Sequence, residues 1–334
     1  MTTVFIISLE QPALSKSEIL ATLRLINIEP KHFSDGRLFF VDCKLSLENL
    51  DFIARRIALS FYICELISKP STIEQLYQEL ESLEFSDDEI VSLHIHNKWG
   101  VQNPECSVPN FKLLREKIHC KNFSYKNSNR IIDIYFTENS IYVLNRIRTI
   151  PRAEFVKRAN RYRPFQSPIS IEPKYARAMI NLSEAKAGER FGDPFCGTGG
   201  ILIEAALVGL YPIGGDISSK VVSGAKKNLE FFGIHNYIFY VGDVSEIKNY
   251  SPLVICTDLP YGRSTTTKKE PLKELYTRAF RIFHDTLSYG QKAVIIIPDI
   301  KYLELCRNLF SIVEVHELRV HRSLTRYFVV MSSE

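Results

Sequence analysis

The run Asp193–Gly200, which reads Asp-Pro-Phe-Cys-Gly-Thr-Gly-Gly, is the feature that most narrows what this chain can fold into. Its glycines let the backbone approach a ligand closely, and the apolar, helix-periodic segment 201–207 follows at once. The pattern predicts a strand, a tight loop and a helix, in that order. The loop is neither a P-loop nor the dinucleotide-binding fingerprint, because no Gly-Lys-Ser or Gly-Lys-Thr follows it.

Residues 173–334 go on to alternate strand-like and helix-like segments. Such alternation is typical of a parallel sheet with helices packed on it. We therefore expect a doubly wound, mostly parallel α/β domain of the Rossmann-like kind. Its later strands are expected at 293–297, 312–318 and 327–331, with a helix over 302–310.

Acidic residues follow the next two predicted strands of this domain. Asp216 ends the segment 211–215, and Asp243 ends the segment 237–242. In a doubly wound sheet these positions line the crevice at the carboxyl ends of the strands. An acid after the second strand suits a ribose diol, and one after the third suits an adenine amino group. Each acid alone is more simply a helix N-cap, but together with the glycine loop they indicate a ligand site.

The turn Asp258-Leu259-Pro260-Tyr261-Gly262 follows the apolar run 252–256, which reads as a buried strand. The Asp258 carboxylate and the Leu259 carbonyl can each accept one hydrogen of an exocyclic amine. Pro260 stiffens the turn, and Tyr261 offers a face for stacking. This geometry suits methylation of an amine on a nucleobase, although such a turn by itself could be an ordinary strand-to-loop connection.

Positive charge is unevenly distributed along the chain. The net charge is +4, yet residues 112–163 hold thirteen Lys or Arg against four Asp or Glu. Aromatic residues are interleaved with these cations, a combination that suits phosphate contact and base stacking. The alternative is a solvated charged face on an ordinary domain.

The rest of the chain predicts four parts. Residues 1–68 read as strand, helix, strand, strand, helix, strand, which fits a ferredoxin-like α+β domain. Residues 69–150 read as a second α+β piece, residues 151–172 as a linker without clear periodicity, and residues 173–334 as the α/β domain.

Cysteine spacing and hydropathy set further limits. The seven cysteines form no Cys-x-x-Cys pair, so we expect reduced thiols and neither a metal site nor a disulfide framework. No apolar run reaches transmembrane length, and the first 25 residues lack a signal-peptide pattern. We expect a cytoplasmic protein without a membrane partner.

The glycine loop and the Asp258 turn together resemble the class I S-adenosylmethionine-dependent methyltransferases that modify exocyclic amines. The flanking segments 161–165 and 262–264, Arg-Tyr-Arg-Pro-Phe and Gly-Arg-Ser, resemble those of tRNA guanine-N2 methyltransferases with a THUMP domain. The closest resemblance is to the archaeal type acting on guanosine 10, and it is strong over about 145–265. Leu259 stands where that family commonly has proline, a change that a backbone carbonyl should tolerate.

This resemblance implies transfer of a methyl group from S-adenosylmethionine to guanine N2 in tRNA, with 69–150 as the THUMP domain. The implied partners are tRNA and, as in some relatives, a small activator subunit. The residues implied at the amine are Asp258, Leu259, Pro260 and Tyr261. Those implied at the cofactor are Asp193, Phe195, Gly197, Thr198, Gly199, Asp216, Ile217, Asp243 and Val244. The candidate RNA contacts are Arg146, Arg148, Arg152, Arg161, Arg163 and Arg263.

Three other hypotheses stay open from the sequence. The enzyme could modify a different guanosine, in tRNA or ribosomal RNA. A DNA adenine-N6 methyltransferase has a similar turn, but the amino-terminal layout disfavours it. A non-enzymatic RNA-binding module would leave both the glycine loop and the amine-binding turn unexplained.

Overall fold

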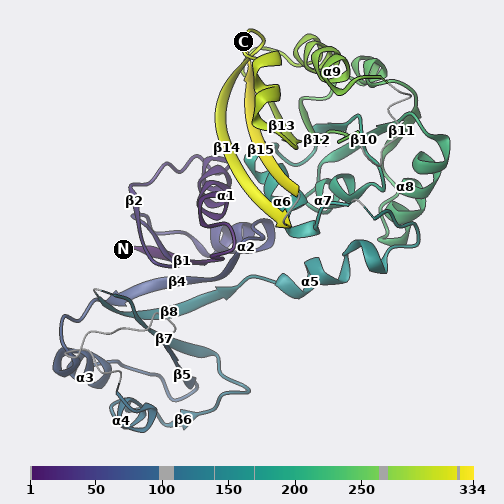
Figure 1. Cartoon of the computed structure of the whole chain (residues 1–334). Helices are drawn as coiled ribbons and strands as arrows, with labels where there is room; N and C mark the ends of the chain where they lie inside the picture. The colour runs from purple at the N-terminus through teal and green to yellow at the C-terminus, as the bar shows by residue number, and fades with distance from the viewer. Residues whose placement is uncertain (1, 98–108, 139, 169, 263–269, 322–323) are drawn as a thin grey trace. The chain divides into compact units, whose positions relative to one another are not determined.

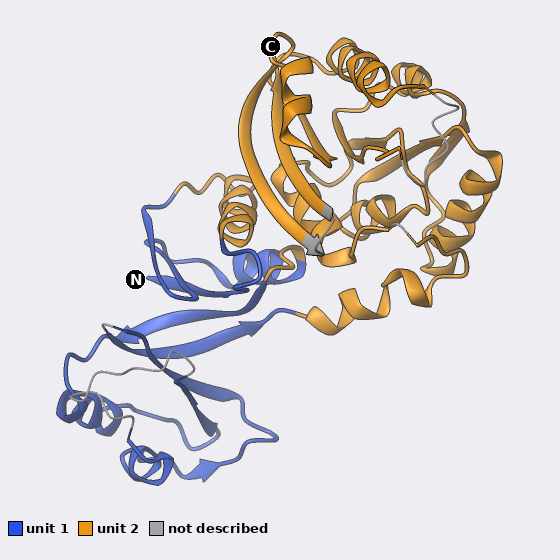
Figure 2. Ribbon diagram, viewed as in Figure 1, with its two compact units in different colours: residues 1–12, 30–55, 60–150 blue, residues 13–29, 56–59, 151–334 orange. Residues whose placement is uncertain are grey.

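The computed structural model describes residues 2–97, 109–138, 140–168, 170–262, 270–321 and 324–334. The chain forms two compact units (Figures 1 and 2). The first comprises residues 1–12, 30–55 and 60–150, and the second comprises residues 13–29, 56–59 and 151–334. Each unit contains one sheet.

The first unit is built on an eight-stranded sheet in the order β2-β3-β1-β4-β8-β7-β5-β6. Its strands are β1 (Thr3–Ile7), β2 (His32–Asp35), β3 (Leu38–Val41), β4 (Ser60–Ser68), β5 (Ile90–His96), β6 (Asn122–Phe123), β7 (Arg130–Phe136) and β8 (Ile141–Thr149). Its helices are α2 (Leu47–Arg56, whose last residue belongs to the second unit), α3 (Ile73–Glu81) and α4 (Phe111–Glu116). Alternate residues of β5, β7 and β8 form an apolar core with α3 and α4.

The second unit contains a seven-stranded sheet in the order β11-β10-β9-β12-β13-β15-β14. Its strands are β9 (Arg190–Asp193), β10 (Tyr211–Asp216), β11 (Ile238–Val241), β12 (Val254–Asp258), β13 (Lys292–Ile297), β14 (Phe310–His321) and β15 (Leu324–Ser333). Strands β9 to β13 pair in parallel, and β15 is antiparallel to both of its neighbours. The doubly wound, mostly parallel sheet expected from the sequence is confirmed.

Helices cover both faces of this second sheet. The helices of this unit are α1 (Pro12–Arg24, of which Pro12 groups with the first unit), α5 (Arg152–Lys157), α6 (Pro173–Leu182), α7 (Gly200–Leu207), α8 (Ser219–Phe231) and α9 (Leu272–Thr286). Short 3-10 turns span η1 (Asn160–Tyr162), η2 (Val244–Tyr250) and η3 (Ile300–Leu305). Where the sequence predicts a helix over 302–310, the η3 turn covers only 302–305, and β14 begins at Phe310.

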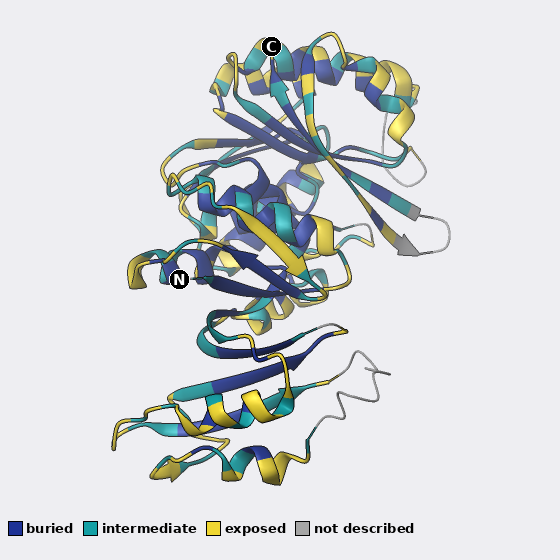
Figure 3. Cartoon of the chain, turned by 90° about the vertical axis from the view of Figure 1, so that its left-hand side faces the viewer, coloured by how far each residue is buried: buried dark blue, intermediate teal, exposed yellow. Residues whose placement is uncertain are grey.

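Alternate residues of β13 are buried on opposite faces of the sheet, so the strand packs against two helical layers. Val294 and Ile296 of β13 pack into the core shared with α6, α7 and α8, whereas Ala293, Ile295 and Ile297 pack toward α9 and η3. Figure 3 shows the resulting pattern of buried strands and outward-facing exposed helix surfaces. No helix among the described residues is long and apolar enough to cross a membrane.

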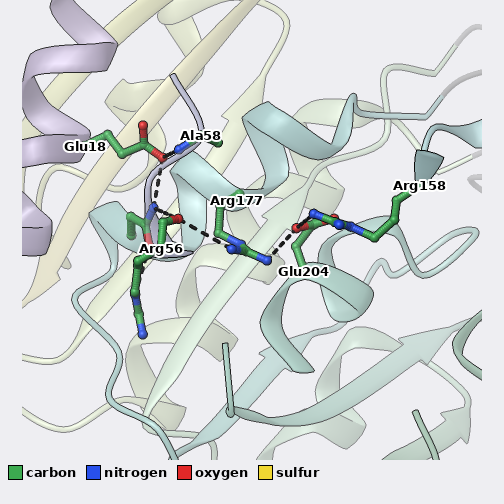
Figure 4. Close-up of polar contacts among 7 residues, drawn as sticks. Glu18, Arg56, Ala58, Arg158, Arg177 and Glu204 are labelled. Carbon is green, nitrogen blue, oxygen red and sulfur yellow. Dashed lines mark hydrogen bonds and ion pairs between the residues drawn. The ribbon is translucent and has the colours of Figure 1, made fainter. Parts of the chain in front are cut away.

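A buried polar network joins α1, α6 and α7 (Figure 4). Glu204 of α7 accepts from Arg158 at 2.6 Å and from Arg177 at 2.7 Å. Glu204 has no exposed side-chain surface, and Arg177 has 4%. A carboxylate buried this deeply is tolerable only because both guanidinium groups compensate its charge.

The same network reaches the chain's first helix. Glu18 of α1 accepts from the N–H groups of Ala58 and Leu59 and from the Asn181 amide, each at 2.9 Å. Arg56 donates to the Asn181 carbonyl oxygen at 2.9 Å. Burial raises the pKa of Glu18 to about 7, although these hydrogen bonds oppose the shift. Residues 13–29 and 56–59 are thereby tied to α6 within one unit.

Removing the central carboxylate should destabilise the second unit strongly. Glu204→Ala leaves Arg158 and Arg177 as buried cations without their partner, and we expect a loss of about 3–5 kcal/mol in the free energy of unfolding. Urea denaturation followed by circular dichroism measures this loss. Glu304→Ala is the control, because Glu304 is 63% exposed and pairs with Arg307, which is 64% exposed. Equal losses in the two variants would contradict a structural role for the Glu204 network.

The glycine loop imposes a second local constraint, at the residue before α7. Gly199 has φ +78° and would place a Cβ 2.9 Å from Leu229 Cδ1. Gly233 has a similar φ of +72° but open space around it. Gly199→Ala should cost about 1–3 kcal/mol more than Gly233→Ala, because overpacking is added to the same backbone strain. Denaturation midpoints of the two variants check this, and equal midpoints would show that the loop tolerates the added methyl.

Candidate active site

A cavity of about 910 Å³ opens at the carboxyl ends of β9, β10 and β12, within the second unit. The strand order reverses between β9 and β12, since the chain runs outward from β9 to β11 and then returns to add β12 on the other side. Ligands of doubly wound folds bind at such a reversal. The volume is in the range of small-molecule and cofactor sites.

Asp193 closes β9 at the back of this cavity. It is 1% exposed, and its Oδ1 accepts from Thr257 Oγ1 at 2.6 Å and from the Phe195 N–H at 3.3 Å. Burial raises the pKa of Asp193 to about 7, against the effect of these hydrogen bonds. The Cys196 N–H donates to the Gly215 carbonyl at 2.8 Å and fixes the loop onto β10.

Two further acids stand at the ends of β10 and β11. Asp216 Oδ1 accepts from the Ser218 N–H at 2.9 Å, and burial raises the pKa of Asp216. Asp243 caps η2 through Ser245 and pairs with Arg278 at 2.6 Å. Burial acts to raise the pKa of Asp243, but the hydrogen bonds from Arg278 and Ser245 outweigh it and hold that pKa below its usual range.

The turn after β12 is fixed by hydrogen bonds from both sides. The Leu259 N–H donates to Ile296 O of β13 at 3.1 Å, and Tyr276 Oη of α9 donates to Pro260 O at 2.8 Å. The turn's backbone is therefore tied to a strand and to a helix.

The two carboxylate oxygens of Asp258 have different neighbours. The Tyr261 hydroxyl donates to Asp258 Oδ1, and Arg326 Nη2 of β15 lies 3.6 Å from Asp258 Oδ2. Burial raises the pKa of Asp258, while the Arg326 charge and the Tyr261 hydrogen bond oppose the shift.

The cavity brings together nearly all of the residues that the sequence singled out for the cofactor and the amine. Those that line it are Asp193, Phe195, Gly197, Thr198, Asp216, Ile217, Asp243, Val244, Asp258, Leu259, Pro260 and Tyr261. Gly199 lies in the same loop as the N-cap of α7 and is not among the lining residues.

The arginines expected at RNA belong to both units and differ in exposure and in partners. Arg161 is exposed, and Arg152 and Arg148 are partly exposed, with Arg148 paired to Asp51 at 2.6 Å. Arg146 binds Asp133 with two of its nitrogens and lies over the Tyr62 ring. Arg263 falls outside the described residues.

Arg163 is buried, whereas an arginine that contacts RNA has to be exposed. It is 2% exposed, and its Nη1 would lie 2.9 Å from a Cβ at Gly200. The side chain donates to the Arg158 carbonyl at 2.9 Å. Arg163 therefore packs behind the glycine loop and is not presented to a phosphate.

Several residues of the site carry no sequence signal that we recognised. Thr257 binds Asp193, Arg278 binds Asp243 and Glu270, and Arg326 approaches Asp258. The pattern of β12 marks Thr257 as an ordinary strand residue, and Arg278 lies on the exposed side of α9. Arg326 is far from Asp258 in sequence, so only strand pairing brings it close.

Comparison with known proteins agrees with this arrangement. A tRNA (guanine(10)-N2)-dimethyltransferase of Pyrococcus abyssi is 40% identical over 208 residues, covering 61% of this chain and 62% of that protein. The protein of the same name from Methanothermobacter thermautotrophicus is 39% identical over 196 residues, covering 58% of each. The chain thus spans about six tenths of the length of these curated relatives.

The solved structure of TrmN from Thermus thermophilus matches 99% of this chain and 100% of its own, with a TM-score of 0.59 and 17% identity, and so shares the fold. The family model described as RMKL-like, methyltransferase domain, matches residues 160–327. Since that match covers half of the sequence and includes the whole cavity edge, the chain belongs to the RMKL-like methyltransferase domain family.

Proposed function

We propose that this protein transfers a methyl group from S-adenosylmethionine to the exocyclic N2 amine of guanosine in tRNA, at position 10. One observation carries the proposal: the Asp258 turn faces the same cavity as the glycine loop and Asp216. A methyl donor and an amine could therefore meet in one cavity. The names of the relatives from Pyrococcus and Methanothermobacter supply the base and the position.

The residues at the strand ends fit S-adenosylmethionine. Asp216 would accept from ribose hydroxyls, and Asp243 with η2 would meet the adenine. The glycine loop from Phe195 to Gly199 would lie against the amino-acid part. When bound, the cofactor supplies an electrophilic methyl group on a positively charged sulfur. The acidic edge formed by Asp193, Asp216 and Asp258 is electrostatically complementary to that charge.

The turn after β12 would hold the guanine amine. Tyr261 already occupies Asp258 Oδ1, so Asp258 Oδ2 is the oxygen through which the amine would bind. The Leu259 carbonyl would accept the second amine hydrogen. Guanine N2 is a poor nucleophile because its lone pair is delocalised into the ring, so holding it in line with the methyl group would supply much of the acceleration. The target base must leave its stack, at a cost of a few kcal/mol.

The rest of the chain would recognise the RNA. We propose that residues 1–68 form a ferredoxin-like domain and residues 69–150 a THUMP RNA-binding domain. Within the first range, residues 13–29 and 56–59 pack in the same unit as the methyltransferase domain. Residues 151–172 would connect these two domains to the methyltransferase domain of 173–334. Exposed cations such as Arg161, which lies over the Tyr162 ring, would contact phosphates. A small activator subunit and a cytoplasmic location complete this proposal.

A second candidate substrate, a small nuclear RNA, is suggested by another relative. The bovine relative named U6 snRNA (guanine-N(2))-methyltransferase is 34% identical over 114 residues, 32% of this chain. Its name gives the same amine in a different RNA. Transcripts of tRNA and U6 small nuclear RNA, with a DNA duplex as a third substrate, would separate these alternatives.

Nucleoside mass spectrometry tests the reaction directly. With labelled cofactor and a tRNA transcript, we expect labelled N2-methylguanosine at position 10, and none when guanosine 10 is replaced by adenosine. Asp258→Ala should lower the rate by on the order of 100-fold, because the amine is no longer positioned. Asp258→Asn should retain partial activity, since its amide oxygen still accepts a hydrogen bond.

Cofactor affinity is the control for those variants. Calorimetry should give nearly unchanged S-adenosylmethionine binding for Asp258→Ala, because this carboxylate is assigned to the substrate. Wild-type turnover by Asp258→Ala would remove Asp258 from the site. Label on adenine, or only in the DNA arm, would overturn the proposed substrate.

Salt dependence tests the RNA contact. If Arg161 neutralises one phosphate, Arg161→Ala should reduce the slope of log affinity against log salt by about 0.7–0.9 and weaken tRNA binding. Arg307→Ala is the matched control, because Arg307 is 64% exposed and lies outside the basic stretch 112–163. Fluorescence anisotropy at four salt concentrations measures both slopes. An unchanged slope for Arg161→Ala, or an equal change in both variants, would contradict the assignment.

A further inference from the structure

Arg326 is a buried cation placed beside the amine-binding turn. It lies on β15, where it pairs in register with Leu318 of β14, and it is 5% exposed. Its Nη2 is 3.6 Å from Asp258 Oδ2, and its guanidinium carbon is 5.9 Å from the centre of the Tyr261 ring. Its Nε is buried and has no hydrogen-bond partner among the described residues. A guanidinium held this way is costly to bury unless a nearby charge compensates it.

The other groups around Asp258 are neutral or negative. Tyr261 faces it from the same turn, Tyr276 from α9 and Asp193 from β9. The Asp258 charge contributes to raising the pKa of Asp193, which shows that the two acids interact. Of the described residues that face Asp258, Arg326 therefore supplies the positive charge.

The two cations that line the cavity among the described residues, Arg278 and Lys220, are engaged elsewhere or lie at a different edge. Arg278 binds both Asp243 and Glu270. Lys220 belongs to α8, whose N-terminus follows Asp216. Neither stands in for Arg326 at the β12 turn.

We propose that Arg326 is a positioning residue for methyl transfer, which keeps Asp258 ionised and holds its Oδ2 ready for the amine while Tyr261 holds Oδ1. This inference rests on the proposed function, because it assigns the amine to Asp258. An ionised carboxylate accepts from an amine hydrogen, whereas a protonated one would present a donor to it. Arg326 thereby acts through Asp258 and not on the substrate itself.

Packing alone does not account for an arginine at this position. The neighbours of Arg326 along and across the hairpin, Phe328 and Leu318, belong to the apolar core. An apolar side chain of similar volume would fill such a place without the cost of desolvating a charge. The nearby Asp258 carboxylate explains why this position carries a positive charge.

The first experiment measures the pKa of the Asp258 carboxyl directly and does not depend on methyl transfer. Protein carrying ¹³C-labelled aspartate carboxyls is titrated by NMR, and Asp258→Asn identifies the Asp258 signal by its loss. Removing an opposite charge within about 4–6 Å should raise the pKa by about 1–3 units, so Arg326→Gln should titrate at higher pH than the wild type. Arg326→Lys keeps the charge and should titrate close to the wild type.

The matched control removes a positive charge from the same hairpin. Arg319 of β14 is exposed and pairs in register with Thr325, the residue before Arg326. Arg319→Gln should leave the Asp258 titration unchanged. A shift as large in Arg319→Gln as in Arg326→Gln, or no shift in Arg326→Gln, overturns the proposal.

The second experiment follows methyl transfer against pH. Because a raised Asp258 pKa leaves the carboxyl protonated over a wider range, the acid limb of kcat/KM should move to higher pH in Arg326→Gln. Its rate should recover as pH rises, with cofactor affinity unchanged. If circular dichroism shows that Arg326→Gln is not folded, Arg326→Lys becomes the deciding variant. A folded Arg326→Lys protein that is inactive at every pH overturns the proposal. A wild-type protein that methylates no RNA, with the NMR shift present, refutes the proposed function and leaves the Arg326–Asp258 coupling standing.

Discussion

The ion pairs of Glu204 with Arg158 and Arg177 hold helix α7, which follows the glycine loop at the cavity. Helix α7 begins at Gly200, immediately after the glycine loop, and Glu204 lies one turn along it. The position of α7 therefore sets where the loop ends. A buried network of this kind adds little stability compared with apolar packing, yet breaking it leaves uncompensated charge in the core. We infer that it is retained because it fixes α7 in one register against α6.

The same constraint extends to segments far away in sequence. Asn181, on the helix that carries Arg177, joins Glu18 to Arg56, so α1 and the short stretch 56–59 pack with the methyltransferase sheet. Glu18 accepts the backbone N–H groups of Ala58 and Leu59, which would otherwise be buried without partners. The catalytic unit is thus completed by residues that precede its sheet by more than a hundred positions.

Local sequence patterns predict the strand ends and the acids that follow them, but not contacts between segments far apart in the sequence. Asp193, Asp216 and Asp258 each end a strand, and Asp243 follows β11 by two residues. Parallel strands bring such ends to one edge, so the cavity could be predicted from four separate motifs. Arg146 and Arg163 could not be placed in the same way. A run of charges does not show which cations find a buried partner, and Arg146 meets Asp133 only through the pairing of β7 with β8. Arg326 depends on the register of two long antiparallel strands, which no local pattern specifies.

The acids at the cavity edge are stabilised in different ways, and the difference bears on how a cofactor would be exchanged. Asp243 has a guanidinium partner in Arg278, whereas Asp193 is held by a hydroxyl and a backbone N–H, and Asp216 by several backbone N–H groups. Burial raises the pKa of Asp193 to about 7, so the negative potential near the glycine loop comes mainly from Asp216, which has no cationic partner among the described residues. Under the proposed function, a sulfonium donor carries a positive charge that its thioether product lacks. The same edge would bind the donor more tightly than the product, so electrostatics would favour release of the product after each transfer.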